Sequence, residues 1–524
     1  MIFSSPHTAV TIPKTTLTDF VLRNATRLDQ KAAFIDGSTG RSVTYREFKE
    51  QVSGLAAALA NQGLRKSEVL AILSPNLPEF VAAFHAAATL GAITTMIPPL
   101  FTHDEIRTQL VDSGARYLLT VPALLNRARD SAQTSSVKQL FVAGEAPGAL
   151  SLASLISRNG KLPKVNINPQ EDVVALPYSS GTIGLPKGVM LTHHNLVAML
   201  AQMQATDPFG EDDTLVCVVP MYHLYGLHVV ANLGLSQGAT IVTLPRFELE
   251  QFLEVLERYR VTVAPLVPPI VLALSRAAIV DHYNLSTLRL IHSGGASLAD
   301  NVARACTERL GCEIRYGYGL TEVSPLSHAS LPDPADHKPG SVGYCLPNTE
   351  CKIVDHASGL ELSPPQQGEI MVRGPQVMKG YLGNAQATAE MIDADGWLRT
   401  GDIGYTDIDG NLFVVDRLKE LIKYKGRQVA PAELEAVLLS HPAIADAAVI
   451  PVLDEEAGEI PKAFVVLRSD AAADEIMRFV ASRVAPHKQV RRIEVVNAIP
   501  KSPAGKILRR VLIEQERQRA GQNT

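Results

Sequence analysis

Apolar segments of strand length alternate with segments of helical pattern through the first four-fifths of this chain. Three strand-then-helix pairs are Val69 to Leu73 with Pro78 to Leu90, Thr214 to Val219 with Leu227 to Leu235, and Ala239 to Leu244 with Leu249 to Tyr259. Strands that alternate with helices are typical of sheets whose strands run parallel and whose faces are covered by helices. The alternation therefore predicts a layered α/β fold with parallel sheets.

The pattern changes towards the C-terminus. From about Pro339 to Phe413, short strand patterns separated by Gly and Pro turns predict a β-rich subdomain. After a strand from Leu412 to Val415, the sequence predicts a small α+β unit that could fold alone. Its expected elements are a helix Pro431 to Ser440, strands Ala445 to Pro451 and Ala463 to Leu467, and a helix Asp474 to Val484. The polar tail from Gln515 is expected to fray.

Composition bounds the kind of protein. The chain has 524 residues, is 46% hydrophobic and carries a formal net charge of −5, which provides for a large core and implies no general attraction to nucleic acid. The apolar stretch from Phe80 to Leu100 has the length of a membrane span. It also contains His85, Gly91 and a Pro98-Pro99 pair, so we expect a buried helix from Glu79 to about Leu90 and then a core strand.

The cysteines and the N-terminus point to one compartment. The five cysteines form no CxxC pattern and no set with histidines that is typical of a metal site, so we expect reduced, mostly buried thiols. The N-terminal segment MIFSSPHTAVTIPK lacks the basic and apolar regions of a signal peptide. We therefore expect a cytoplasmic protein.

The loop from Tyr178 to Gly188 reads YSSGTIGLPKG and follows an apolar strand pattern, Val173 to Leu176. Gly184 and Gly188 are expected to allow positive φ, and Lys187 adds a charge. Backbone N–H groups, small hydroxyls and a lysine suit a polyphosphate. The loop lacks the GxxxxGK[ST] spacing of a P-loop, and by itself it is also compatible with a plain Gly/Ser surface turn.

The wording of this loop resembles the phosphate loop of the adenylate-forming superfamily, and further segments match that family in order. They are YGYGLTE (Tyr316 to Glu322), GEIMVRG (Gly368 to Gly374), MKGY (Met378 to Tyr381), GWLRTGDIG (Gly396 to Gly404), DRLKELIKYKGRQVAPAE (Asp416 to Glu433) and PKSPAGKILRR (Pro500 to Arg510). The resemblance covers nearly the whole chain and is strongest to the 4-coumarate:CoA ligase, or aryl-CoA ligase, branch.

The resemblance implies an ATP- and Mg²⁺-dependent ligase of the acyl-CoA synthetase type. Such an enzyme adenylates a carboxylic acid and transfers the acyl group to coenzyme A. The family places its domain hinge at the position of Asp416, which implies an N-terminal domain of residues 1–415 and a small mobile domain of residues 416–524. The acid is expected to be aryl or cinnamate-like, with medium-chain fatty acids still open.

Site residues follow by matching motifs one by one. Lys506 matches the catalytic lysine; the alternative is a solvated lysine in a basic run. Attack of a carboxylate on a phosphate needs a cation where negative charge builds up. Glu322 matches the residue that helps to hold Mg²⁺, and Asp402 matches the carboxylate that accepts both ribose hydroxyls. The positions implied for the nucleotide are Ser179, Ser180, Gly181, Thr182, Lys187, Thr321, Asp402, Arg417, Lys423 and Gln428, with Thr182 also counted as catalytic.

Two further sites are implied in the same way. Lys425 and Gly426 match positions that contact coenzyme A when the thioester forms. His223, also counted as catalytic, and Tyr225 match an aromatic gate between the acyl pocket and the coenzyme A channel. The remaining pocket positions are Val229, Gly295, Gly317 and Leu320, which could also reflect ordinary tight packing. A flat ring is expected between a strand bearing Gly295 and a loop bearing Gly317.

Three residues depart from the family pattern. Ile183 replaces the second Thr of SSGTTG, Tyr316 stands where the aryl-CoA branch usually has Gln, and Arg427 replaces an aromatic residue. Ile183 and Tyr316 keep other functions open: loading of a carrier protein, or activation of nitrite for diazotisation of an arylamine. A luciferase-type oxygenase shares the motifs, and a nucleotide-binding protein without catalysis is the alternative from another class.

Overall fold

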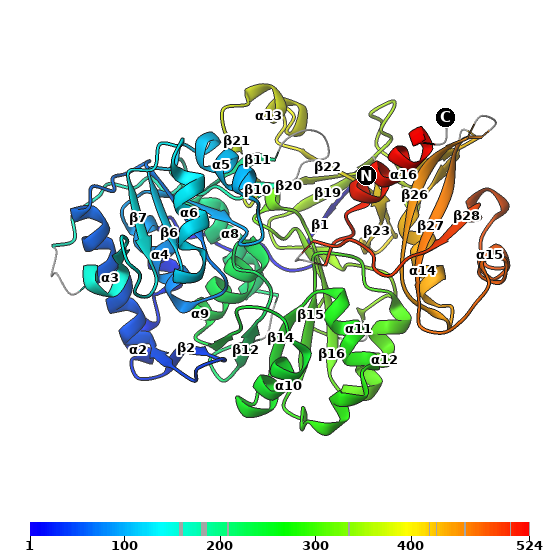
Figure 1. Cartoon of the computed structure of the whole chain (residues 1–524). Coiled ribbons are helices and arrows are strands. Elements are labelled where there is room, and N and C mark those ends of the chain that lie inside the picture. The colour runs from blue at the N-terminus through cyan, green and yellow to red at the C-terminus, as the bar shows by residue number, and fades with distance from the viewer. Residues whose placement is uncertain are drawn as a thin grey trace.

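The computed structural model of the chain describes residues 1–156, 161–179, 186–206, 209–333, 336–418, 420–425, 427–454, 457–502 and 505–522, with the backbone alone at 427, 428 and 520–522. Figure 1 shows two large layered sheets, drawn in blue to cyan and in green, with a smaller sheet beside them. The orange and red C-terminal unit lies at the other side of the molecule. This arrangement confirms the predicted fold class.

The first large sheet has the order β10-β11-β9-β5-β4-β6-β7-β8, with β21 paired to β11. Its strands are β4 (Val69–Leu73), β5 (Ile93–Ile97), β6 (Tyr117–Thr120), β7 (Gln139–Val142), β8 (Leu150–Ser151), β9 (Val173–Ala175), β10 (Tyr178–Ser179), β11 (Lys187–Thr192) and β21 (Gly380–Tyr381). The strands from β9 to β8 are parallel, whereas β10, β11 and β21 pair antiparallel. Every residue of β4 is buried, as helices on both faces of a parallel sheet require.

The second large sheet has the order β18-β17-β16-β15-β14-β12-β13-β2-β3. Its strands are β2 (Ala32–Asp36), β3 (Ser42–Thr44), β12 (Thr214–Cys217), β13 (Thr240–Thr243), β14 (Val263–Leu266), β15 (Leu290–Ser293), β16 (Glu313–Tyr318), β17 (His328–Ala329) and β18 (Tyr344–Cys345). The run from β2 to β16 is parallel. One hydrophobic core joins this sheet to the first through residues such as Phe34, Phe84 and Phe252.

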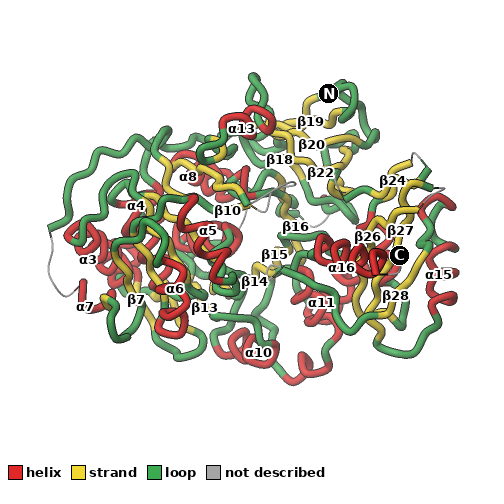
Figure 2. Tube along the Cα trace, turned by 45° about the horizontal axis from the view of Figure 1, so that its top comes forward, coloured by secondary structure: helices red, strands yellow, loops and turns green. Residues whose placement is uncertain are grey.

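Helices pack around both sheets, as the tube in Figure 2 shows. In chain order they are α1 (Leu17–Val21), α2 (Ala25–Leu28), α3 (Tyr45–Asn61), α4 (Pro78–Thr89), α5 (His103–Asp112), α6 (Leu125–Ala132), α7 (Leu152–Ile156), α8 (His193–Gln204), α9 (Leu233–Gln237), α10 (Leu249–Arg258), α11 (Pro268–Arg276), α12 (Asp300–Leu310) and α13 (Ala385–Met391), with 3₁₀ turns η1 (Pro122–Leu124) and η3 (Ala278–His282). Thr44 and Glu47 form a capping box that starts α3, while Pro78 occupies the first turn of α4. The apolar stretch from Phe80 to Leu100 is thus a buried helix and a core strand, as predicted.

The β-rich subdomain is an antiparallel sheet of order β1-β19-β20-β22-β23. Its strands are β1 (Ile2–Ser4), β19 (Glu350–Val354), β20 (Gly368–Arg373), β22 (Leu398–Thr406) and β23 (Leu412–Arg417). The predicted strand end at Val415 is wrong, because Asp416 and Arg417 continue the ladder opposite Ile403 and Asp402. This register brings the side chains of Arg417 and Asp402 to the same place.

The C-terminal unit has its own sheet and core. The sheet consists of β24 (Ile422–Tyr424), β25 (Arg427–Val429), β26 (Ile444–Asp454), β27 (Gly458–Leu467) and β28 (Arg492–Val495), and its helices are α14 (Pro431–Leu439), α15 (Ala473–Ala481), η6 (Pro486–Lys488) and α16 (Arg509–Gln522). Leu434, Val449 and Val465 are among the buried residues of this separate core. The expected fraying from Gln515 is wrong: α16 continues to Gln522, because Leu512 is buried and Glu516 pairs with Lys462.

Two further local predictions are wrong. The segment expected to be an α-helix from Leu227 to Leu235 is a π-helix, η2 (Tyr225–Asn232), followed by α9. Gly188 does not provide positive φ, since it lies within β11. Across the described residues, every helix is too short or too polar to span a bilayer. The five cysteines are buried and free, as predicted.

Candidate active site

Glu322 lies among hydroxyls and a lysine. It belongs to the 3₁₀ turn η4 (Thr321–Val323), just after β16, and only 4% of its surface is exposed. Ser179 and Tyr381 both donate their hydroxyls to its Oε1, at 2.8 and 2.9 Å. The Nζ of Lys187 lies 5.1 Å from the centre of the Tyr381 ring. A buried carboxylate needs such partners, so Glu322 is held in a defined orientation between the two large sheets.

The two strands that flank the predicted phosphate loop pair with each other. Ser179, on β10, pairs with Lys187, on β11, which brings both residues to the base of the loop beside Glu322. The predicted residues Ser180, Gly181 and Thr182 lie outside the described residues, as does Ile183. Thr321 is the first residue of η4 and directly precedes Glu322.

Asp402 is a buried carboxylate on strand β22 of the β-rich subdomain. Tyr318 donates its hydroxyl to Asp402 Oδ2 at 2.8 Å, and the Nε of Arg417 lies 3.4 Å from Oδ1. Burial raises the pKa of Asp402, while the charge of Arg417 and the hydrogen bond from Tyr318 act to lower it. A carboxylate with partners on both oxygens is oriented for bonding to a vicinal diol such as ribose.

Lys506 approaches this carboxylate from the C-terminal unit. It lies in a turn closed by a bridge between Lys501 and Ile507, and its N–H donates to Ser502 Oγ at 3.1 Å. Burial lowers the pKa of Lys506 to about 8; Arg417 also lowers it, whereas Glu420 and Asp402 raise it. The amine is therefore mainly protonated at neutral pH and lies within the field of the Asp402 group.

The aromatic gate residues border the second large sheet. The hydroxyl of Tyr225 donates to the carbonyls of Leu266 and His292 at 3.2 and 2.8 Å, which ties η2 to the ends of β14 and β15. His223 precedes η2 and packs at 5.0 Å, centre to centre, against Tyr222. Burial lowers the pKa of His223 to about 4, so the imidazole is neutral at pH 7.

The expected placement of the pocket glycines is reversed. Gly295 lies in the loop after β15, exposed and with φ +84°, whereas Gly317 lies within β16, opposite Ala329. The neighbour of the gate is Gly294, where a Cβ would lie 3.4 Å from the Tyr225 ring. Position 317 is also tight, since a Cβ there would lie 3.1 Å from a methyl of Leu326. Among the other predicted pocket residues, Val229 is buried on η2 and Leu320 is the N-cap residue of η4.

A hairpin of the C-terminal unit carries Lys425, predicted to contact coenzyme A, and Lys423 and Gln428, predicted to contact the nucleotide. Lys423, on β24, pairs with Gln428, on β25, and Lys425 lies at the turn with φ +47°. The side chains of Lys423 and Lys425 are exposed. Gly426 lies outside the described residues, and of Gln428 only the backbone is described. The N–H of Lys423 donates to Glu459 and the N–H of Lys425 donates to the Ala457 carbonyl, so these hydrogen bonds of the described residues stay within the C-terminal unit.

Glu322 fits a magnesium ion that is shared with phosphates. Within the described ranges, no group of three or more His, Cys, Asp or Glu side chains could hold a metal ion alone. Mg²⁺ commonly binds one or two carboxylates together with substrate phosphates and water. The hydroxyls of Ser179 and Tyr381 both donate to Oε1 of Glu322, so one carboxylate oxygen fixes the side chain in place. The residues present thus fit a metal brought in with a nucleotide.

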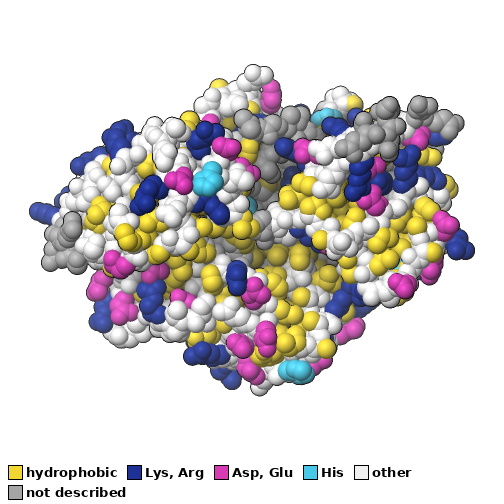
Figure 3. Space-filling model, viewed as in Figure 1, with side chains coloured by type: hydrophobic (Ala, Val, Ile, Leu, Met, Phe, Trp, Pro, Cys, Tyr) yellow, Lys and Arg dark blue, Asp and Glu magenta, His cyan; other side chains and the backbone are white. Residues whose placement is uncertain are grey.

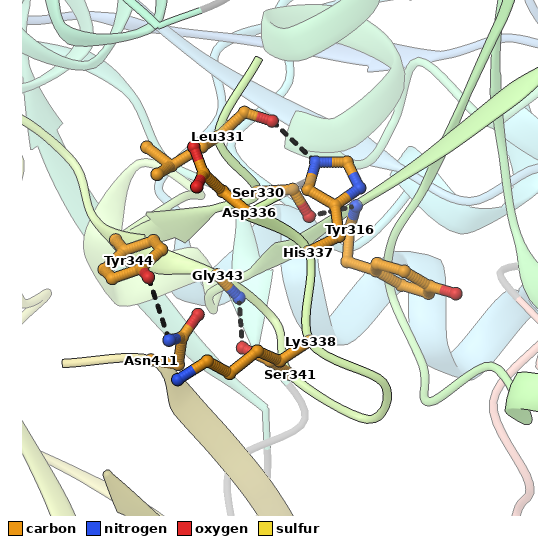
Figure 4. Close-up of a pocket in the computed structure, with 10 residues that line it drawn as sticks. All are labelled: Tyr316, Ser330, Leu331, Asp336, His337, Lys338, Ser341, Gly343, Tyr344 and Asn411. Carbon is orange, nitrogen blue, oxygen red and sulfur yellow. Dashed lines mark hydrogen bonds between the residues drawn. The ribbon is translucent and has the colours of Figure 1, made fainter. Parts of the chain in front are cut away.

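Tyr316, one of the three departures, borders a small cavity instead of the Glu322 group (Figure 4). The cavity is about 10 Å³, room for at most one water molecule, and Figure 4 shows the Tyr316 ring pointing away from the other labelled side chains. The face of the molecule in Figure 3 is hollowed in the middle, with hydrophobic side chains along the hollow.

The fold and these groups define a nucleotide-binding enzyme of a known class. An AMP-binding enzyme family model matches residues 21–382, and an AMP-binding enzyme C-terminal domain model matches residues 433–506. The chain belongs to the AMP-binding enzyme family. This finding confirms the predicted family, and the second match includes Lys506.

The relatives narrow the comparison. The chain is similar to 4-coumarate–CoA ligase 1 of Solanum tuberosum, with 44% identity over 98% of this chain and 96% of that protein. Among solved structures, the anthranilate CoA ligase AuaEII in complex with anthranoyl-AMP has a TM-score of 0.90 at 27% identity, covering 98% of this chain and 99% of that one. The amide bond synthetase McbA from Marinactinospora thermotolerans has a TM-score of 0.85 at 28% identity, covering 95% of this chain and 99% of that one.

Sequence reasoning did not assign a role to several residues that the structure brings into the site. Tyr318 and Tyr381 lie within the matched motifs YGYGLTE and MKGY, but the motifs did not indicate what the two tyrosines do. Each donates its hydroxyl to a buried carboxylate, and only the folded structure shows this contact. Gly294 and Glu420 are likewise set by tertiary contacts, with Tyr225 and with Arg509.

Proposed function

We propose that this protein is an ATP-dependent acid–thiol ligase that joins an aromatic or arylpropenoic carboxylic acid to coenzyme A through an acyl-adenylate. The observation that carries the proposal is the assembly of Lys506 and Asp402 across the two parts of the chain. The 44% identity to a 4-coumarate–CoA ligase over nearly the full length supports the choice of acid and acceptor.

In the first half-reaction, a carboxylate oxygen of the acid attacks the α-phosphorus of ATP, and the bond to pyrophosphate breaks. We assign to Asp402 the two ribose hydroxyls and to Lys506 the negative charge that develops on the transferred phosphate. Preorganised charges of this kind lower the barrier because they need no reorganisation during the reaction. Glu322, with Ser179 and Tyr381 on its Oε1, would hold Mg²⁺ with the phosphates and neutralise part of their charge.

In the second half-reaction, the coenzyme A thiolate attacks the acyl carbonyl and AMP leaves. We propose that residues 416–524 rotate as a unit relative to residues 1–415, which withdraws Lys506 and turns the hairpin with Lys425 and Gly426 inwards. Two observations support a hinge near Asp416: this residue lies at the end of β23, and the chain beyond it has a separate hydrophobic core. His223, neutral because of burial, would border the thiol without adding a charge.

The acid is assigned from residues at and beside the predicted acyl pocket. Tyr225, Val229 and Gly294 offer an aromatic, an aliphatic and a bare backbone surface in close proximity. Such a mostly apolar lining suits a flat ring with few polar substituents. The relative with 4-coumarate in its name and the neighbour with bound anthranoyl-AMP both act on aryl carboxylates by their names.

An amine acceptor is the second candidate, because one similar structure is that of an amide bond synthetase. The deciding assay measures pyrophosphate release from ATP with 4-coumarate, anthranilate, hexanoate, acetate or nitrite, each with and without coenzyme A or an arylamine. We expect release with an aryl acid and thioester only with coenzyme A. Release with nitrite alone, or an amide in place of a thioester, would reject this proposal. We further assign the enzyme to the cytoplasm, in keeping with its free cysteines.

A further inference from the structure

Arg509 connects three elements of the C-terminal unit. It is the first residue of α16, and its side chain is 11% exposed. The Nη1 group donates to the carboxylate of Glu420, the Nη2 group to Glu435 at 2.7 Å, and the Nε group to the Val449 carbonyl at 3.2 Å. Glu420 follows β23, Glu435 lies on α14, and Val449 lies on β26. A planar guanidinium suits this geometry because its donors point in fixed directions.

The acidic groups around Arg509 depend on its charge. Glu435 is 7% exposed, and its Oε1 accepts the N–H of Val449 at 2.7 Å. Burial raises the pKa of Glu435 to about 7, and Arg509 is the largest influence that opposes this rise. Asp416 is also buried, and it accepts the N–H of Ala432 in the first turn of α14 at 2.9 Å. Buried carboxylates are costly without a cation, so the charge of Arg509 stabilises both Glu435, which it binds, and Asp416, which itself binds the start of α14.

The same side chain lies beside the turn that carries Lys506. Only Ile507 and Leu508 separate the two residues, and Lys506 is hydrogen-bonded within its turn to Ser502. On the other side, a Cβ at Gly505 would lie 2.9 Å from Pro269 on α11. The turn therefore lies between α11 on one side and, on the other, Arg509 with its partners Glu420 and Glu435.

Glu420 acts on both Arg509 and Lys506, on the first through a hydrogen bond and on the second through its charge. It binds Arg509, and it is also one of the two carboxylates that act on Lys506, the other being Asp402. Arg509 and Arg417 are the cations that face Lys506. Loss of Arg509 would free Glu420 to move and would remove the constraint at the start of α16.

We infer that Arg509 is a positioning residue for adenylation, fixing Glu420 and the Lys506 turn so that the lysine meets the developing phosphate charge. The inference rests on the proposed function. Arg509 itself touches neither the nucleotide nor the acid. Thioester formation, in which Lys506 has withdrawn, does not need this constraint.

The chain offers a matched control in the next residue. Arg510 has the same side chain, but it is 83% exposed and pairs only with Glu514 one turn along α16. The full-length variants Arg509→Met, Arg509→Lys and Arg510→Met are compared in two assays. The first measures pyrophosphate release from ATP and 4-coumarate without coenzyme A, and the second measures thioester formation from supplied coumaroyl-adenylate and coenzyme A.

We expect Arg509→Met to lower kcat/KM for ATP in adenylation by about 10²-fold and thioester formation by less than about threefold, since misplacing a catalytic group by about 1 Å has a cost of this order. Arg509→Lys should fall between this variant and wild type. Arg510→Met should stay within about twofold in both assays, as for other exposed pairs. The fall of kcat/KM above pH 8 should also move to higher pH in Arg509→Met, because a cation facing Lys506 is lost while Glu420 and Asp402 remain.

Equal loss in both half-reactions, or adenylation by Arg509→Met within threefold of wild type, would overturn the inference. If neither Arg509 variant folds, Glu420→Leu decides in their place, because it removes one hydrogen-bond acceptor of Arg509 and leaves the Arg509–Glu435 pair. Unchanged adenylation by Glu420→Leu would then overturn the inference. A wild-type protein that releases no pyrophosphate with any carboxylic acid would instead reject the proposed function itself.

Discussion

The protonation state of Lys506 should control adenylation above neutral pH. Burial lowers the pKa of this amine to about 8, with Arg417 and Arg509 lowering it further and Glu420 and Asp402 opposing them. Because the charged form is the one that stabilises the phosphate, activity is present below this pKa and is lost as pH rises through it. A lysine with the ordinary pKa near 10.4 would stay mostly protonated between pH 7 and pH 9, so the enzyme would lose little activity in this pH range.

The size of the effect follows from the pKa. With a value of about 8, the protonated fraction is about nine-tenths at pH 7 and about one-tenth at pH 9, so kcat/KM for ATP should fall about tenfold between them. Lys506→Ala should lower adenylation by about 10²–10³-fold at pH 7, the usual cost of one preorganised charge. Lys506→Arg, which stays protonated, should lose the fall between pH 7 and pH 9 whatever its absolute rate.

The assay is pyrophosphate release without coenzyme A, measured from pH 6.5 to pH 9.5 at ATP concentrations well below KM. Thioester formation from supplied acyl-adenylate serves as the control for folding, and Lys506→Ala should retain it. A wild-type profile that is flat to pH 9.5 would refute the lowered pKa. Adenylation by Lys506→Ala within tenfold of wild type would refute the catalytic role.

Three other predictions test separate parts of the site. Gly426→Trp should spare acyl-adenylate formation and slow transfer to coenzyme A, and equal loss in separately measured half-reactions would contradict this. Gly317→Leu should raise KM for 4-coumarate far more than for acetate, with little change for ATP, because the added side chain enters beside Leu326 in a tight space; a parallel loss for both acids would reject an aryl pocket at this strand. Tyr381→Phe keeps the ring near Lys187 but removes a hydrogen bond to a buried carboxylate, which should raise the KM for MgATP about tenfold. Tyr405→Phe, whose ring stacks on Phe413, is the control for Tyr381→Phe, and an equal effect in the two variants would remove Tyr381 from the site.

The predicted elements agreed best with the structure where one local signal dominates. The fully apolar segment Val69–Leu73 is a strand over the predicted residues, because sheet burial and β-branched composition act in the same direction. The stretch from Phe80 to Leu100 was correctly divided, since its Gly and Pro residues break a span. Motif wording predicted the roles of Asp402, Glu322 and Lys506, which stay predictions. The structure places Asp402 beside Arg417 and Glu322 beside Ser179, both also predicted site residues.

The errors arise where contacts that the local pattern does not show decide the structure. In the π-helix at Tyr225–Asn232, Gly226 lies so close to the Pro220 carbonyl that a Cβ on this glycine would be 2.4 Å from the carbonyl oxygen. The hydrophobic pattern of the eight helical residues does not reveal this contact. The tail from Gln515 is polar, but it is helical because Leu512 and the Glu516–Lys462 pair fix it to the C-terminal unit. Gly295 and Gly317 were assigned to the wrong kinds of element because a glycine suits both a turn and a crowded strand, so the residue type alone does not decide between them.

Strand β16 restricts how the acid specificity of such an enzyme can be changed. Its successive residues Gly317 and Tyr318 face opposite sides of the sheet, so one strand borders the proposed acid pocket and supplies the hydrogen bond to Asp402. An insertion there would shift Tyr318 and Glu322 together with the pocket wall, and would disturb nucleotide binding. The η2 wall bears Val229, and among the described residues its side-chain hydrogen bonds run to other partners than Asp402 and Glu322. Directed evolution for larger or smaller acids should therefore accumulate changes on η2 and leave the length of β16 intact.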